Sequence, residues 1–232
     1  MKYFDMIQRQ STGRVRFAVG VFTFFVLCLM YTPESLWADE KAPSSPRAEM
    51  QVVLDQLISV VTENAGEENA TVRRDKMRDI IEPKFDFKEM AKRSLGVNWK
   101  SITPEEQQEF VDLFSGMLAR TYIGRIEKVE QNMVEIKSET LRHPRALVKT
   151  IVTFDGGEFP LDYKLIYSDA GWQVYDVIIE NIGLISNYRN EFAGIIRKES
   201  FQGLLTRLRE KENSEVSEET KVSRVLLLSA LS

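Results

Sequence analysis

The amino-acid sequence predicts an α+β fold, in which a four-stranded antiparallel meander is packed on one face by N-terminal helices and a C-terminal helix and encloses an apolar cavity. A change of periodicity supports this prediction. In the first half of the chain apolar residues recur at helical spacing, whereas from about Val129 they alternate with polar residues. Turn-forming segments at 155–157 and 168–171 then separate the alternating runs, as in β-hairpins.

The N-terminal residues 1–38 have the pattern of a secretory signal peptide. Three arginines precede an apolar run over 17–31, which is shorter than the roughly 20 residues that a membrane span needs. Ala38 is the small residue at which we expect cleavage, and an uncleaved N-terminal anchor remains the alternative. Cleavage removes Cys28, so the exported chain has no thiol to mispair in an oxidising compartment. Residues 39–46 are polar and broken by prolines, so we expect a leader without regular structure.

Four helices are expected before the sheet. Apolar residues at helical spacing predict helices over 47–64 and 71–81. Asp86, followed three residues later by a glutamate, is the expected N-cap of the third helix, which ends at Gly96. Thr103 has the same relation to Glu106 and begins the fourth and longest helix.

The second half of the chain is expected to form strands over 130–181, then a helix from about Ser186. The third strand is the clearest, because aromatic and aliphatic residues from Phe159 to Tyr167 alternate with mostly polar ones. Ser200 and Gly203 interrupt the closing helix. We place the folded domain at 47–211 and expect the Glu/Ser-rich segment 212–232 to be disordered.

The composition and the absence of known motifs argue against several kinds of functional site. A net charge of −4 gives no basic surface for nucleic acid, and no nucleophile elbow, phosphate loop or set of zinc ligands is present. The single histidine, His143, precedes a proline in a charged loop and is expected to be a surface residue. Asp176 is expected on the strand face that carries Trp172. A buried carboxylate there is either a general acid or base of an enzyme or a structural group held by a partner such as Arg189.

Several segments together resemble one family. They are GWQVYDVIIENIGLISNYRNEF at 171–192, RSLG at 93–96, WKSITPEEQQEF at 99–110, FVDLFSGMLARTY at 110–122 and IIRKESFQGLLTRLREK at 195–211. In this order they resemble the MlaC family, the periplasmic phospholipid-binding proteins of the Mla lipid-asymmetry pathway, also known as toluene-tolerance auxiliary proteins of an ABC transporter. The segment beyond residue 211 is not a feature of the family.

The resemblance implies a periplasmic carrier that needs no cofactor and is not an enzyme. Its cargo would be phospholipid, and its partners an inner-membrane ABC transporter complex and an outer-membrane lipoprotein–porin complex. Aromatic and aliphatic residues of the long helix, the third strand and the closing helix would face one another across a lipid-binding hollow. The expected lining residues are Trp99, Phe110, Phe114, Leu118, Tyr122, Phe159, Leu161, Tyr163, Leu165, Trp172, Tyr188, Phe192 and Ile196. Two alternatives stay open: an enzyme that uses Asp176 on an apolar small molecule, and an interaction module with a filled core.

Overall fold

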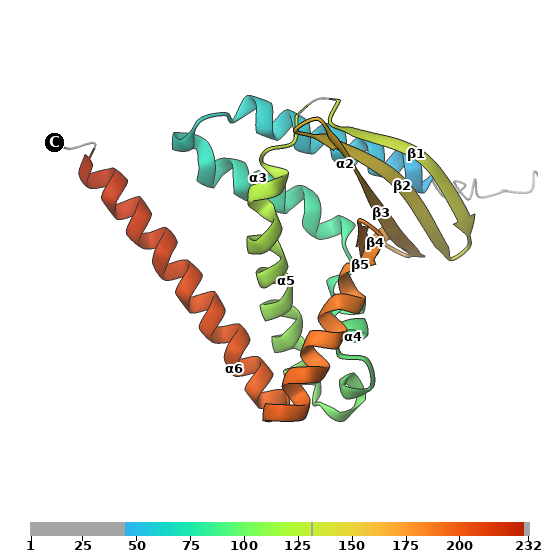
Figure 1. Cartoon of the computed structure of the whole chain (residues 1–232), viewed down its shortest axis with the longest axis vertical. Helices are drawn as coiled ribbons and strands as arrows, with labels where there is room; N and C mark the ends of the chain where they lie inside the picture. Colours follow the sequence, from blue (N-terminus) through green and yellow to red (C-terminus); the bar gives the residue numbers. More distant parts are fainter. Residues whose placement is uncertain (1–44, 131, 230–232) are drawn as a thin grey trace, which may run out of the picture. The chain divides into compact units, whose positions relative to one another are not determined.

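The computed structural model describes residues 45–130 and 132–229, and Figure 1 shows their arrangement. The predicted signal peptide, its cleavage site and nearly all of the leader lie outside the described residues. Within the described ranges the α+β prediction is confirmed, with helices first, one antiparallel sheet next and a helix last.

The third and fourth predicted helices begin at the predicted caps. At the third helix the Asp86 carboxylate accepts a hydrogen bond from the Glu89 N–H at 2.8 Å. At the fourth, Thr103 and Glu106 each accept from the other's backbone N–H, which satisfies two N–H groups that a helix start leaves unpaired. The elements are α2 (Pro46–Glu63), η1 (Glu67–Asn69), α3 (Ala70–Ile81), η2 (Glu82–Lys84), α4 (Phe87–Leu95), η3 (Gly96–Ser101) and α5 (Pro104–Ile126).

The sheet is a meander in which each strand pairs antiparallel with the next, in the order β1-β2-β3-β4-β5. The four predicted strands are present, and a fifth strand of two residues extends the edge beyond β4. The strands are β1 (Val134–Arg142), β2 (Arg145–Phe154), β3 (Gly157–Ser168), β4 (Gly171–Ile179) and β5 (Ile182–Gly183).

Helix α6 (Leu184–Ser229) closes the described chain and bends at Ser200, where φ is 73° and ψ is 173°. The Ser200 hydroxyl accepts from the N–H of Gly203 at 3.4 Å, as an N-cap does, so a second helical stretch begins there. We call 184–199 the first arm and 201–229 the second arm of α6 (Figure 1). The described helix continues to Ser229, and the disorder expected over 212–232 stays a prediction. The segment contains no proline or glycine, so nothing in its sequence interrupts the helix.

Apolar side chains gather in two main clusters. The helical core joins α4, α5 and α6, and includes Phe110, Phe114 and Phe192. The sheet core joins α2 to the sheet, and includes Met50, Leu165 and Trp172. Phe85 and Leu184 pack against both clusters and so connect them.

Candidate functional site

One face of the sheet carries an apolar surface that the helices cover only in part. Directly opposed residues of an antiparallel pair lie on the same face. Val152 pairs with both Val134 and Phe159, and Leu161 pairs with Ile179, so these side chains form one patch across four strands. Their side chains are half-buried, apart from Phe159, which is 40% exposed. We call the half-buried and exposed apolar residues of this face the inner-face patch: Val134, Val152, Phe159, Leu161, Tyr163 and Ile179.

Cover over this face increases along β3. Phe159, next to the β2–β3 turn, is 40% exposed; Leu161 and Tyr163 are half-buried; Leu165 is only 1% exposed. Leu165 and its neighbour Trp172 belong to the sheet core with Met50 and Leu54 of α2. The inner face is therefore open near the β2–β3 turn and closed where α2 packs on it.

Tyr163 combines burial with residual accessibility. Burial raises the pKa of its phenol well above the ordinary value, which means that protein surrounds the side chain. Part of the side chain nevertheless remains accessible.

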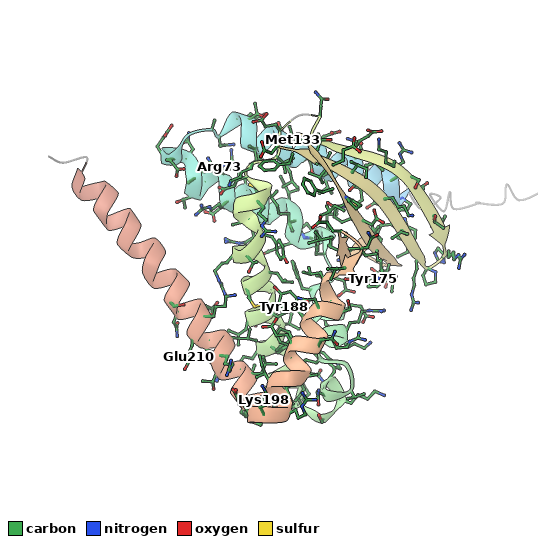
Figure 2. The ribbon with its side chains drawn as sticks, in the orientation of Figure 1. Arg73, Met133, Tyr175, Tyr188, Lys198 and Glu210 are labelled. Carbon is green, nitrogen blue, oxygen red and sulfur yellow. The ribbon has the colours of Figure 1, made fainter. Side chains whose placement is uncertain are left out.

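The helical part of the expected lining is packed differently. Phe110 and Phe114 are fully buried, and their rings stack on each other with centroids 5.6 Å apart. Phe192 lies edge-on to both rings. Tyr188 of α6, which is labelled in Figure 2, lies edge-on to Phe114. Burial and the nearby Tyr122 raise the pKa of Tyr188. These aromatic residues form a filled core in this structure.

A groove opens beside this core, between α5 and the two arms of α6. Its volume is about 730 Å³. Apolar residues from three helical stretches line it, and charged residues of α6 stand among them. We call this the helical groove, lined by Met117, Tyr188, Glu191, Phe192, Ile195, Leu204, Arg207, Leu208, Glu210, Lys211 and Ser214.

The structure divides the thirteen expected lining residues between the two cores. Phe159, which is exposed, and Leu161, Tyr163, Leu165 and Trp172 lie on the inner face of the sheet. The helical core holds the others: Trp99, Phe110, Phe114, Leu118, Tyr122, Tyr188, Phe192 and Ile196.

Sequence reasoning missed several members of these surfaces. Val134, Val152 and Ile179 belong to the inner-face patch, and Ile195 and Leu204 line the helical groove. The alternation along β1, β2 and β4 and the helical spacing along α6 contain these positions. The sequence pattern of an aliphatic residue at such a position is the same whether its side chain faces a filled core or a recess.

Asp176 does not lie on the predicted face. The pairing of β3 with β4 shifts between Lys164 and Leu165, which leaves Tyr175 as an extra residue in β4. This β-bulge reverses the alternation, so Asp176 lies opposite Lys164 on the outer face, away from Trp172.

Both carboxylate oxygens of Asp176 are engaged. One accepts from the Lys164 ammonium at 2.8 Å and the other from the Ile185 N–H at 3.1 Å. Ile185 is the second residue of α6, and Gly183, at the N-cap position, has no side chain to cap the helix. Asp176 therefore caps α6 from the neighbouring strand. Lys164, rather than the suggested Arg189, is its ion-pair partner; the Arg189 guanidinium donates to the Arg93 carbonyl at 2.7 Å.

Other kinds of site are not apparent in the described part of the chain. His143 is exposed at the β1–β2 turn, with its ring against Tyr167. Within residues 45–130 and 132–229, no group of three or more His, Cys, Asp or Glu side chains is placed to hold a metal ion. None of the helices described is long and apolar enough to cross a membrane.

Comparison with known proteins agrees with this architecture. The family model described as MlaC protein matches residues 51–210. The intermembrane phospholipid transport system binding protein MlaC of Haemophilus influenzae is 19% identical over 207 residues, covering 84% of this chain and 93% of that protein. The solved structure of a phospholipid-binding protein from Ralstonia solanacearum, in complex with a phospholipid, superposes with a TM-score of 0.65 at 28% identity. That match covers 72% of this chain and 96% of the other. Because the family model spans most of the folded domain, the chain belongs to the MlaC family.

Proposed function

We propose that this protein is a phospholipid carrier that holds acyl chains against the inner-face patch. One observation carries the proposal: the similar Ralstonia protein, matched over nearly its whole length, was solved with a phospholipid bound. The patch supplies a surface of the required chemistry in this chain, because it is apolar, continuous across four strands and incompletely covered.

The free energy of acyl-chain hydration requires the binding site to shield most of the chain from water. Removing a methylene from water is worth about 0.8 kcal/mol, so two acyl chains with roughly 30 methylenes represent about 24 kcal/mol. A carrier must cover most of that length to hold its cargo in water. The change from open to closed along β3 suits this task, with the acyl ends toward Leu165 and the headgroup toward the β2–β3 turn, near Phe159.

The helical residues of the expected lining have a supporting role in this proposal. Phe110 and Phe114 have almost no accessible surface, so they hold α5 and α6 together. The helical groove, with charged residues among its apolar ones, is the second surface to test, because a chain that leaves the inner face could lie there.

The finer assignments rest on the family and on the N-terminal pattern. We propose that the protein is exported to the periplasm and exchanges lipid between an inner-membrane ABC transporter complex and an outer-membrane lipoprotein–porin complex. Catalysis is not part of the proposal. Asp176, the buried carboxylate that suggested an enzyme, lies on the other face of the sheet, and both of its oxygens accept hydrogen bonds.

Mass spectrometry of lipid extracted from the purified protein tests the carrier function. Phospholipid at a fixed ratio to protein is expected, and its absence from protein taken directly from the native periplasm contradicts the proposal.

A matched pair of variants tests the position of the cargo. Leu161→Trp fills the space that the proposal assigns to acyl chains without adding charge, so bound phospholipid should fall while the melting temperature stays unchanged. Ile166→Trp is the control, because Ile166 is half-buried on the outer face of the same strand. Ile195→Trp probes the helical groove. If Leu161→Trp keeps its lipid but loses about 1–3 kcal/mol of stability, the inner face is a filled core and the placement is wrong. Lipid loss in Ile195→Trp alone would move the site to the groove.

A further inference from the structure

The inner-face patch contains one hydroxyl group, that of Tyr163. The residue lies opposite Val148 of β2 and Val177 of β4. Among the residues that the structure describes, no group is hydrogen-bonded to the Tyr163 oxygen. The Thr150 hydroxyl of the same face, by contrast, donates to the Leu161 carbonyl. Tyr163 therefore keeps a free donor in a patch whose other members are apolar.

The Tyr163 oxygen faces accessible space. In the described part of the chain, no buried or half-buried side chain has a fully enclosed nitrogen or oxygen atom that lacks a partner. Because the Tyr163 oxygen has no partner, it is not fully enclosed. Burial of the rest of the side chain raises the pKa of the phenol well above the ordinary value, so the hydroxyl stays protonated and neutral. The patch thus presents a neutral hydrogen-bond donor to the space above it.

A donor in this position favours a cargo that offers an acceptor. A cargo that covers the Tyr163 hydroxyl removes it from water, which is unfavourable unless the cargo accepts a hydrogen bond in return. Sites for small molecules commonly place a few polar groups in an apolar lining, where these groups fix the orientation of the ligand. Tyr163 has the position and the chemistry of such a group.

The surroundings of Tyr163 indicate which acceptor it meets. A diacyl phospholipid carries a charged phosphate and two neutral ester carbonyls. On β2, β3 and β4 of the described sheet, the inner-face positions carry no charged side chain. Glu139, at an inner-face position of β1, is acidic and accepts hydrogen bonds from Ser45 and from the Arg47 N–H. A phosphate here would lose its water with no cation to replace it, whereas a neutral carbonyl needs only a neutral donor.

We propose that the Tyr163 hydroxyl donates a hydrogen bond to an acyl ester carbonyl of the bound phospholipid, and so makes the site selective for ester-linked over ether-linked lipid. The inference rests on the proposed carrier function and adds a specificity-determining residue to it. The ester group would lie between the open part of the inner face at Phe159 and the closed part at Leu165. The headgroup would then extend toward the β2–β3 turn.

Competition between two lipids tests the inference on the exported chain. Delipidated protein is loaded from an equimolar mixture of dipalmitoyl phosphatidylethanolamine and its dihexadecyl ether analogue, which has the same headgroup and chain length but no carbonyls. Mass spectrometry of the extracted lipid gives the ester-to-ether ratio. One net hydrogen bond predicts a preference of about threefold to tenfold for the ester lipid.

Two tyrosine variants locate the donor. Tyr163→Phe keeps the ring and removes the hydroxyl, so the ester-to-ether ratio should fall to about one. Tyr167→Phe is the matched control, because Tyr167 is a half-buried tyrosine of the same strand and face, beside Trp172 and beyond Leu165. Its ratio should equal that of the unaltered protein. A change in folding alone would lower both lipids together and leave the ratio in place.

Infrared spectroscopy of the loaded protein gives a direct readout. The ester carbonyl stretch of the bound lipid lies clear of the protein amide band, and a donated hydrogen bond lowers its frequency. The stretch should therefore lie at a lower frequency in the unaltered protein than in Tyr163→Phe.

Three results would overturn the inference. The first is an ester-to-ether ratio of about one in the unaltered protein. The second is a preference for the ester lipid that survives in Tyr163→Phe, or that is lost in Tyr167→Phe instead. The third comes from palmitic acid added to the same mixture: if its binding depends on Tyr163 while the phospholipid ratio stays at about one, the hydroxyl serves a free fatty acid. Equal binding of both phospholipids leaves the carrier proposal standing, whereas binding of neither contradicts the carrier proposal itself.

Discussion

Replacing Asp176 by alanine separates a structural carboxylate from a functional one. Asp176 is 6% exposed and bridges β4, β3 and the start of α6 through Lys164 and the Ile185 N–H. No other side chain caps this helix from the N-cap position, because Gly183 stands there. The variant should lose stability and keep its lipid.

The magnitude follows from the groups left behind. The Ile185 N–H belongs to a residue that is only 2% exposed, and leaving such a buried donor unpaired costs about 1–3 kcal/mol. Loss of the negative charge at the start of α6 adds about 0.3–1 kcal/mol. The Lys164 side chain is 37% exposed and can turn to water, so its loss of a partner adds less than about 1 kcal/mol. The total is about 1–5 kcal/mol, or roughly 3–20 °C in melting temperature for a domain of this size.

Thermal unfolding followed by circular dichroism, beside phospholipid content, measures both quantities. Asp176→Asn keeps an oxygen for the Ile185 N–H and should cost only about 1 kcal/mol. Asp162→Ala, a half-buried carboxylate on the same face of β3, is the control and should stay within about 1 kcal/mol of the unaltered protein. An Asp176→Ala protein that melts normally but has lost its lipid would refute this reasoning and place the carboxylate at the cargo.

Three further outcomes are expected. Burial raises the pKa of Tyr163, so the phenol proton is lost from the unfolded chain at a lower pH than from the folded protein. Above about pH 10 the free energy of unfolding should therefore fall by up to about 1.4 kcal/mol per pH unit, and in chemical denaturation Tyr163→Phe should lessen that slope. An unchanged slope would show that the phenol is not buried. Thr103→Ala removes half of the capping box of α5 and should cost about 1 kcal/mol in the same assay, with no change in lipid content. N-terminal sequencing of the exported protein should begin at Asp39, and a full-length protein in the membrane fraction would contradict this. Truncation after Lys211 should leave melting temperature and lipid content unchanged, and a fall of several degrees in melting temperature would contradict that expectation.

Local signals explain why most of the fold could be predicted. Helix starts depend on a few adjacent residues, such as Thr103 and Glu106, whose side chains and backbone N–H groups satisfy one another without help from the rest of the chain. The bend at Ser200 is local in the same way, because Ser200 caps the stretch that follows it. Local features of this kind can be recognised in the sequence, because they depend only on residues that are close together along the chain.

The candidate site was less predictable, because accessibility depends on what packs from elsewhere. Phe114 and Leu161 are equally apolar positions of amphipathic elements, yet one is fully buried among aromatic rings of α6 and the other is half-buried on the inner face. Periodicity assigns both to the inside and does not separate a filled core from a recess. The packing of other elements distinguishes them: α2 covers Leu165, whereas the β3 residues nearer the β2–β3 turn are only half-buried or exposed.

Asp176 shows how one residue in the backbone changes a functional interpretation. Strict alternation from Trp172 places its carboxylate on the inner face, beside the proposed cargo, where an acid or base would act. The bulge at Tyr175 turns it to the outer face, where the same carboxylate supplies the cap that Gly183 lacks. The extra residue also keeps Val174 and Val177 together on the apolar face, since they lie opposite Leu165 and Tyr163. The bulge therefore removes a charge from the inner face and preserves its apolar surface, which is the condition for holding acyl chains there.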